Sequence, residues 1–320
     1  MSLYKFTPIL KSTLWDGDRI VTFKNMDTSQ QQVGESWEIS GVKGFETLVS
    51  DGKYKGLSIN ELVSIEKERI MGKANYQQFG NEFPLLIKFI DAHNDLSIQV
   101  HPDDETAHRH GKPSGKSEMW YCLPSDEGAK LYNGLSKNIT VEEYKQMVED
   151  DTICDALAQY EIHEGDVFFI PSGRIHSIGK GCFVTEIQQS SDVTYRIYDF
   201  KRKDKNGNYR ALHIQEAGES IDYEVHDDYH IPYTPRKNEG VKLVECPFFT
   251  TSVFDLDEPF TLDYSSLDSF VILVCLEGEC VLTCDDGEQT SLHAGESLLV
   301  SATTQRIEVQ GTVKFLETYV

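Results

Sequence analysis

The sequence has few positive charges for its size and no long apolar run. Of its 320 residues, 30 are Lys or Arg and 53 are Asp or Glu, so the formal net charge is -23 at pH 7. Nucleic acids and anionic membranes are bound through clustered Lys and Arg, so neither is an expected partner. No segment is apolar enough to span a bilayer, and residues 1–8 lack the pattern of a signal peptide. We therefore expect a cytoplasmic protein.

Cysteine is also scarce, with seven residues and no CxxC spacing. An odd number without that spacing predicts reduced thiols rather than a disulfide framework. Cys280 and Cys284 lie close together, but only His293 is near them in sequence. We interpret Cys280 and Cys284 as buried thiols rather than metal ligands.

We expect the chain to be a monomer or a weak homodimer.

Short strand-like segments separated by Gly, Pro, Asn or Asp dominate the chain. The clearest ones are 36–40, 84–91, 96–101, 119–123, 166–171, 183–188 and 194–200.

Two segments instead predict helices added to a β scaffold, at about 58–72 and 140–159. The first opens on a capping Ser58, and the second opens on Thr140, where Thr-Val-Glu-Glu has the form of a capping box. A polar, Pro-containing stretch at 227–240 reads as a linker. It predicts a domain boundary, with one domain over 1–235 and a second over 240–320.

The C-terminal part of the chain resembles a degraded copy of the middle part. The segment from Gly165 to His176 aligns with the segment from Gly295 to Arg306, and each contains a glycine, an acid, a strand, a turn and a second strand. Arg306 stands where the first copy has His176. We predict two related β-barrels, of which only the first keeps a plausible metal ligand.

Candidate ligands gather on neighbouring short strands. Strict alternation in 96–101 places Gln99 and His101 on one strand face, and Lys116 and Glu118 share a face of the next strand-like run. His176 follows the turn at 171–173. Two imidazoles, a carboxylate and an amide oxygen suit zinc, with manganese, iron or cobalt as competitors. In the alternative interpretation, His101 merely ends a strand and His176 is a polar turn residue.

Around these residues the sequence resembles the type I mannose-6-phosphate isomerases in their short bacterial form. The matching segments are SIQVHPDDETAH (97–108), KSEMWY (116–121), GRIHSIG (173–179), TYRIYDF (194–200), GESWEIS (34–40) and FPLLIKFIDA (83–92). The resemblance covers about residues 1–220 and continues weakly to the C-terminus. It implies a mainly β, double-cupin fold of two jelly-roll-like barrels with short helical additions, in agreement with the repeat.

The resemblance also implies roles for individual residues. The metal ligands of the family fall on Gln99, His101, Glu118 and His176, and its catalytic arginine falls on Arg196. Lys116 matches a lysine of the family's active site, although longer relatives carry Pro where this chain has Ser117. Glu186 matches an acid that has been considered as the proton-transfer base.

The expected function is a metal-dependent aldose-ketose isomerase that interconverts mannose 6-phosphate and fructose 6-phosphate through an enediolate. A metal would stabilise the enediolate charge, and Glu186 or Lys116 would move the proton between C1 and C2. Lys112, Lys116 and Arg196 are the cations predicted to bind phosphate.

Two other functions stay open at this point. Two histidines and one carboxylate are also the facial triad of non-haem iron oxygenases, although Gln99 and the Arg/Lys pair argue against that function. The second alternative is a noncatalytic sugar-binding barrel, in which the scaffold outlives its site.

Overall fold

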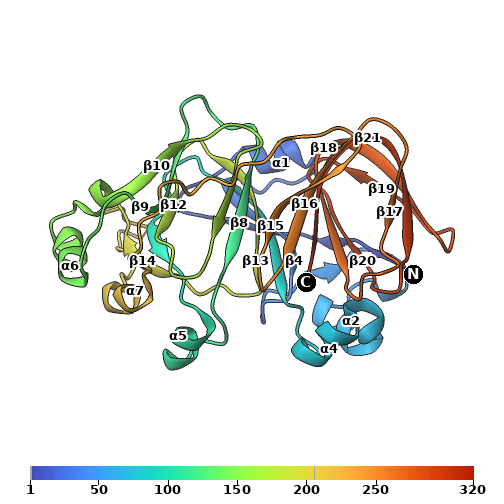
Figure 1. Ribbon diagram of the computed structural model, residues 1–320, viewed down its shortest axis with the longest axis horizontal. Helices are drawn as coiled ribbons and strands as arrows, with labels where there is room; N and C mark the ends of the chain where they lie inside the picture. The colour runs from blue at the N-terminus through green and yellow to red at the C-terminus, as the bar shows by residue number, and fades with distance from the viewer. Residues whose placement is uncertain (1, 205) are drawn as a thin grey trace.

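The computed structural model describes residues 2–204 and 206–320, and it is built mainly of β-strands (Figure 1). Two strand-rich halves lie side by side, and most helices lie at their outer and lower edges in this view, whereas α1 lies at the top between the halves. Both marked chain ends, N and C, lie in the half formed by the C-terminal strands. Among the described residues, no helix is long and apolar enough to cross a membrane.

The catalytic half, as we call it below, is made of two sheets. The five-stranded sheet contains β10 (Leu157–Glu161), β9 (Lys130–Leu135), β12 (His176–Ile178), β7 (Ile98–Val100) and β14 (Tyr195–Tyr198). The six-stranded sheet contains β11 (Val167–Ile170), β8 (Glu118–Cys122), β13 (Phe183–Gln189), β6 (Leu85–Asp91), β4 (Val33–Ser40) and β3 (Ile9–Ser12). Apolar side chains from both sheets, including Trp120, Val184, Leu131 and Ile178, form one buried cluster between them.

The C-terminal half is one eight-stranded sheet around its own apolar cluster. Its strands are β1 (Leu3–Tyr4), β15 (Gly240–Glu245), β16 (Thr250–Leu256), β17 (Phe260–Asp263), β18 (Val271–Cys284), β19 (Gln289–His293), β20 (Ser297–Val300) and β21 (Arg306–Tyr319). A small sheet pairs β2 (Phe6–Thr7) with β5 (Leu48–Val49). Cys280 and Cys284 are buried in the apolar cluster of the C-terminal half, which confirms their interpretation as buried thiols.

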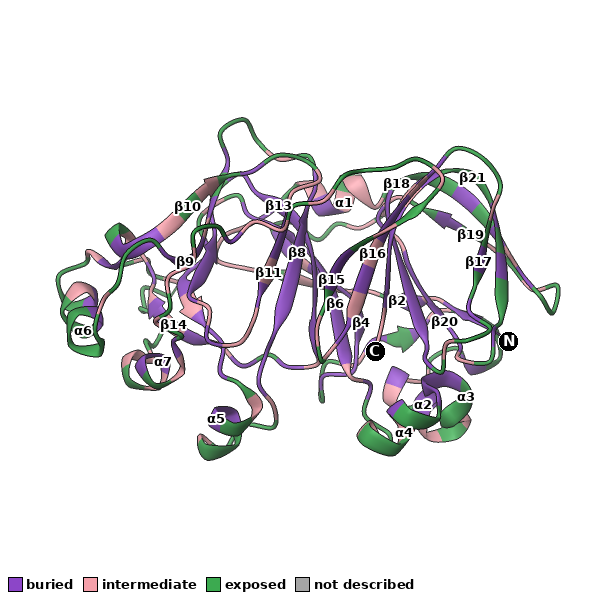
Figure 2. Cartoon of the chain, viewed as in Figure 1, coloured by how far each residue is buried: buried purple, intermediate pink, exposed green. Residues whose placement is uncertain are grey.

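The two halves pack against each other through a third cluster, which joins β6 and β13 of the catalytic half to β16, β18 and β21. Strands β6 and β13 are therefore covered on both faces, and every residue in them is buried (Figure 2). This explains the unbroken apolar run at Leu85–Ile87, because a strand with no solvent face does not need to alternate.

The predicted repeat is confirmed in the order of the elements. Gly165 and Gly295 both have a positive φ, at 90° and 81°, which a residue with a side chain rarely adopts. Strand β11 or β20 follows each glycine, and the next strand then starts at His176 or at Arg306. The predicted division into 1–235 and 240–320 stays a prediction, and β1 crosses it by pairing with β20.

The predicted helices were correct at their starts and wrong in their lengths. Ser58 and Thr140 each form a complete capping box. The first helix breaks at Lys67, whose φ of 53° is left-handed, into α2 (Ile59–Glu66) and α3 (Glu68–Met71). The second, α6 (Val141–Glu149), stops before Asp151, whose φ of 58° turns the chain toward a 3-10 turn and β10.

Further short helices connect the strands at the edges of both halves. They are α1 (Arg19–Phe23), α4 (Lys73–Phe79), α5 (Asp104–Arg109) and α7 (Ile214–Ser220), with single 3-10 turns η1 (Gly52–Tyr54) and η2 (Ile153–Ala156).

Candidate active site

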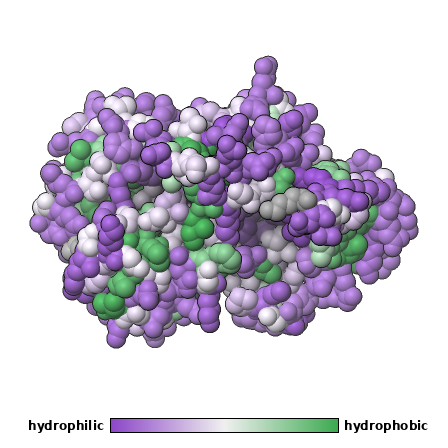
Figure 3. Space-filling view, turned by 180° about the vertical axis from the view of Figure 1, so that it is seen from behind, coloured by the Kyte–Doolittle hydropathy of each residue, from purple (hydrophilic) through white to green (hydrophobic). Residues whose placement is uncertain are grey.

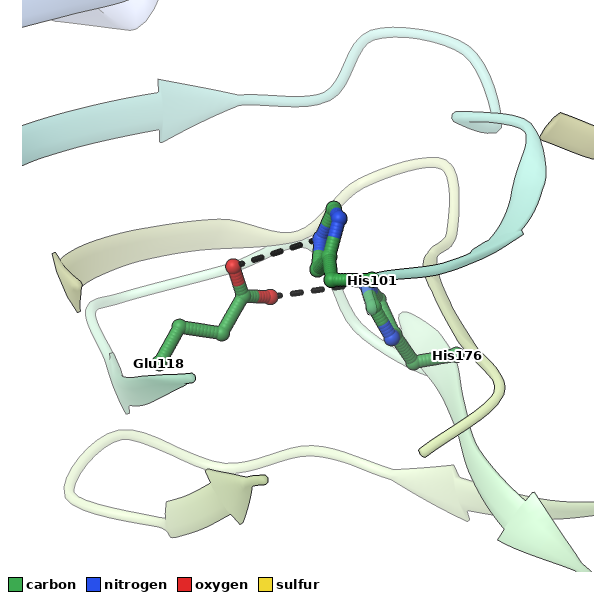
Figure 4. A group of neighbouring side chains, drawn as sticks. All are labelled: His101, Glu118 and His176. Atoms are coloured by element: carbon green, nitrogen blue, oxygen red, sulfur yellow. Dashed lines mark ion pairs between the residues drawn. The ribbon is translucent and has the colours of Figure 1, made fainter. Parts of the chain in front are cut away.

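Three of the predicted ligands meet in the interior of the catalytic half. His101, Glu118 and His176 are completely or almost completely buried, and their ligand atoms all lie within 4.8 Å of one another. Glu118 points one carboxylate oxygen at each ring (Figure 4): Oε2 lies 3.5 Å from His101 Nε2, and Oε1 lies 3.4 Å from His176 Nε2. His101 follows β7, Glu118 opens β8 and His176 opens β12, so the ends of three strands build the cluster.

Both imidazoles are oriented as neutral ligands. The Nδ1 atom of His101 lies 2.7 Å from the carbonyl of Val193, and that of His176 lies 2.8 Å from the carbonyl of Arg174. A carbonyl can only accept, so each Nδ1 carries the proton and each Nε2 turns its lone pair toward Glu118. Burial lowers the pKa of His176 to about 4, and burial together with nearby Lys116 lowers that of His101, which favours the neutral rings.

The carboxylate of Glu118 has few partners for a buried charge. Neither of its oxygens accepts a well-formed hydrogen bond from the described residues, although Lys116 Nζ is in ion-pair contact with Oε2. Burial raises the pKa of Glu118 to about 7, and the charge of Glu186 adds to the rise while Lys116 opposes it. A buried carboxylate between two inward lone pairs fits a divalent cation, which would satisfy all three groups.

Gln99 lies beside this cluster, because its residue pairs with His176 across β7 and β12. Its Nε2 atom lies 3.3 Å from His176 Nε2, and its Oε1 accepts a hydrogen bond from Ser97. A half turn of the amide would place the oxygen at the cluster, and amide orientations are assigned from such networks. The structure thus brings all four predicted ligands together, with the amide nitrogen of Gln99 facing inward.

Lys116 and Glu186 form a charged network next to the cluster. Lys116 Nζ lies 3.2 Å from His101 Nε2 and 3.5 Å from Glu186 Oε1. Glu186 also binds Lys88 Nζ at 3.1 Å and accepts a hydrogen bond of 2.9 Å from Trp120 Nε1. Burial alone would raise the pKa of Glu186, but Lys116, Lys88 and the hydrogen bonds outweigh it and hold the carboxyl ionised.

A small cavity of about 110 Å³ opens beside this network, lined by Gln99, Lys116, Glu186 and Arg196 among others. Figure 3 shows a hollow in the catalytic half, which lies at the right because the molecule is seen from behind. The cavity is smaller than a hexose phosphate, so part of such a molecule would extend from it toward solvent.

Two arginines stand on the wall of the cavity. Arg196 lies opposite Gln99 in the pairing of β14 with β7, and its buried Nε donates to none of the described residues. Arg210 is 21% exposed and pairs with Asp199 at 2.6 Å. Burial would raise the pKa of Asp199, but hydrogen bonds from Arg210 and Arg202 lower it, so the aspartate stays ionised and fixes Arg210 in place.

The structure differs from the predicted phosphate cations in two respects. Lys112 is exposed and does not line the cavity, and Lys116 is already engaged by Glu118 and Glu186. Two further charged residues that line the cavity, Lys88 and Arg210, were not predicted from the sequence. Lys88 could have been found, because a lysine within a fully apolar strand needs a buried partner. Arg210 lies in a loop with no pattern that distinguishes it.

Comparison with known proteins points to one family. The profile described as phosphomannose isomerase type I, catalytic domain, matches residues 3–132, and that of the mannose-6-phosphate isomerase cupin domain matches 239–320. The mannose-6-phosphate isomerase ManA of Bacillus subtilis is 33% identical over 277 residues, which cover 86% of this chain and 85% of the relative. The mannose-6-phosphate isomerase of Streptococcus mutans is 32% identical over 311 residues, covering 96% and 94%.

Solved structures agree with these sequence matches. The crystal structure of the mannose 6-phosphate isomerase from Bacillus subtilis aligns over 100% of both chains, with a TM-score of 0.90 and 28% identity. A phosphomannose isomerase variant from Salmonella typhimurium aligns over 100% of this chain and 99% of its own, with a TM-score of 0.81 and 16% identity, and supports the fold alone. The predicted mainly β, double-cupin fold is confirmed.

Proposed function

Because this chain belongs to the type I phosphomannose isomerase family, we propose how its own side chains interconvert mannose 6-phosphate and fructose 6-phosphate. The observation that carries the proposal is the buried group of His101, Glu118 and His176 with Lys116 and Glu186 directly beside it. Family membership does not favour the oxygenase or the binding protein. We also propose that the isomerase site lies in the predicted domain over 1–235. The cytoplasmic location and the monomeric or weakly dimeric state of the protein stay predictions.

We propose that His101, Glu118, His176 and, after rotation of its amide, Gln99 hold one zinc ion. The two neutral rings and the unsatisfied carboxylate support a divalent cation, and the absence of a thiolate leaves manganese, iron and cobalt as competitors. When bound, the metal supplies Lewis-acid stabilisation of the negative charge that develops on the sugar oxygens.

Lys116 is our candidate for moving the proton between C1 and C2. It lines the cavity and lies next to both a ligand ring and Glu186. Glu186 is a weak base for taking up a proton, because two lysines and Trp120 stabilise its ionised form. We assign Glu186 the role of fixing the two lysines in position, with Lys88 and Trp120 holding Glu186 in turn.

We propose different roles for the two arginines of the cavity wall: Arg196 stabilises the enediolate, and Arg210 binds the phosphate. Arg196 stands across from Gln99 and lines the cavity, so its guanidinium is placed to donate to the oxyanion of the enediolate. Arg210 lies at the partly exposed wall, where the phosphate would extend, and its guanidinium is oriented by Asp199. We propose Arg210 as a phosphate cation in place of Lys112.

The experiment that tests this function is a coupled assay for fructose 6-phosphate formation from mannose 6-phosphate. Activity is expected to disappear after chelator treatment and to return when zinc is added to the stripped protein. Activity that ignores the chelator would leave the isomerase and remove the metal site. If no metal restores turnover in a folded sample, the isomerase function itself is wrong.

Replacing Arg210 by Met is expected to raise KM for mannose 6-phosphate about 10- to 100-fold with little change in kcat, because one charge-assisted hydrogen bond to phosphate is lost. Steady-state kinetics of the variant would measure both constants. Lys112→Met is the matched control, since it removes a lysine outside the cavity and should leave KM unchanged. If Lys112→Met raises KM and Arg210→Met does not, Lys112 rather than Arg210 binds the phosphate.

A further inference from the structure

The strand register shows that the C-terminal sheet repeats the catalytic half position by position. In the catalytic half, one row across β11, β8, β13 and β6 contains Phe168, Trp120, Glu186 and Lys88. The matching row across β20, β18, β21 and β16 contains Leu298, Leu273, Glu317 and Ser252. Each row starts three residues after its left-handed glycine, and the next strand beyond its last member, β4 or β15, pairs with a bulge. Glu317 therefore occupies the position of Glu186.

The same alignment places a second cavity on the position of the active site. The catalytic cavity is lined by Glu35, Ile90, Leu96, Gln99 and Glu186, and the second by their counterparts Gly240, Phe254, Phe260, Asp263 and Glu317. The second cavity is larger, about 420 Å³ against about 110 Å³. Lys88 and Trp120 line the catalytic cavity, whereas their counterparts Ser252 and Leu273 do not line the second one.

The metal donors are gone from this second cavity. Val271 pairs with Val300 as Glu118 pairs with Ile170, so an apolar side chain replaces the carboxylate. Arg306 replaces His176 and lies 3.5 Å from Asp263, the counterpart of Gln99. A metal ion is therefore not the ligand of this cavity.

Glu317 keeps the carboxyl group of its counterpart but has none of the cations that accompany Glu186. Glu186 binds Lys88 and Lys116, and the equivalent positions are Ser252 and Ser269. Glu317 is 7% exposed and accepts a hydrogen bond of 2.6 Å from Tyr264, but no Lys, Arg or His of the described chain forms an ion pair with it. Lys242 lies opposite Ser252 in the pairing of β15 with β16, but its amino group forms an ion pair with Glu245 rather than with Glu317. Burial raises the pKa of Glu317, and Tyr264 only partly opposes the rise.

Aromatic side chains surround this uncompensated acid. Phe254, Phe260, Tyr264 and Tyr319 all line the cavity, and the rings of Phe254 and Phe260 meet at 64° with centroids 5.7 Å apart. Aromatic faces attract cations, most strongly where water is excluded, and they commonly bind alkylated ammonium groups. No lysine or arginine lines the cavity, which disfavours phosphate esters.

We propose that the C-terminal sheet carries a second binding site, remodelled from the same repeat as the active site, for a small quaternary ammonium ion of about the size of choline. The ammonium group would lie against Glu317 and the aromatic walls and would supply the positive charge that Lys88 and Lys116 supply to Glu186. The site is independent of the isomerase reaction.

Calorimetric titration of the intact, metal-loaded protein with choline tests the site. Its neutral isostere 3,3-dimethyl-1-butanol has the same shape without the charge, so we expect choline to bind at least about tenfold more tightly. Glu317→Gln should weaken choline binding at least about tenfold by the same reasoning, and Phe260→Ala should weaken it several-fold. Glu186→Gln, the same change at the equivalent position, should leave choline binding unaltered.

Equal binding of choline and its isostere would overturn the proposal, as would undiminished binding by Glu317→Gln or no binding at millimolar choline. Circular dichroism checks that Glu317→Gln is folded. If it is not, Phe260→Ala decides, because this half-exposed ring can be removed without touching the buried acid. Choline binding that Phe260→Ala leaves unchanged then contradicts the site.

Discussion

Replacing Glu118 by Gln is expected to lower kcat/KM by about 10³-fold or more, because the loss of a Lewis acid removes several kcal/mol of transition-state stabilisation. Gln keeps the shape of the side chain and removes the negative charge that lies between the two Nε2 atoms. The variant should also lose its thermal stabilisation by zinc. The parent protein gains about 2.7 kcal/mol when zinc is present at a hundred times its Kd, so its melting temperature should rise on zinc addition.

Thermal melts of stripped protein with and without zinc provide the measurement. Glu186→Gln is the matched control, since it makes the same change at an equally buried carboxylate whose partners are Lys88, Lys116 and Trp120. We expect this control to keep its zinc-dependent shift. A Glu118→Gln variant whose melting temperature rises with zinc as much as that of the parent would contradict the metal site.

Replacing Lys116 by Met is expected to slow exchange of the C2 proton with solvent by about 10²- to 10⁴-fold, the usual contribution of a general acid or base. Glu186→Gln should slow it by only about tenfold, because a carboxyl with a lowered pKa has little tendency to take a proton. In that variant the loss reflects a displaced Lys116 rather than a missing base.

Exchange is measured by the appearance of deuterium at C2 of mannose 6-phosphate in heavy water, apart from product formation. Lys88→Met removes the other buried lysine bound to Glu186, so it separates the loss of one positive charge from the loss of the proton carrier. We expect Lys88→Met to keep most of the exchange. If Glu186→Gln stops exchange and Lys116→Met does not, Glu186 is the base and our assignment is reversed.

The ligand cluster could be predicted because its information is local. Alternation fixes the shared face of Gln99 and His101, and the turn before His176 fixes where the next strand begins. The repeat could be predicted as well, since Gly165 and Gly295 mark equivalent positions where the backbone has a positive φ. The capping residue Ser58 and the capping box at Thr140 could be predicted for the same reason, because each helix start is contained in four consecutive residues.

The rest depends on contacts between distant segments or on single backbone angles. The first predicted helix is interrupted at Lys67 and the second ends before Asp151, and the periodic pattern of the sequence did not indicate the positive φ of either residue. Lys88 joins the site only because β13 brings Glu186 beside β6, and Arg210 joins it only through Asp199. The equivalence of Glu317 and Glu186 emerged from strand register, since the flanking sequences no longer match.

The pairing of β1 with β20 has a consequence for synthesis of the chain. Leu3 and Tyr4 are synthesised almost 300 residues before their partners Val300 and Leu299. Tyr4 also belongs to the core between the halves, which needs β18 and β21. Domains usually fold as units during translation, and such long-range closure is slow. Strand β1 can therefore take its place in the sheet only after β20 has been synthesised.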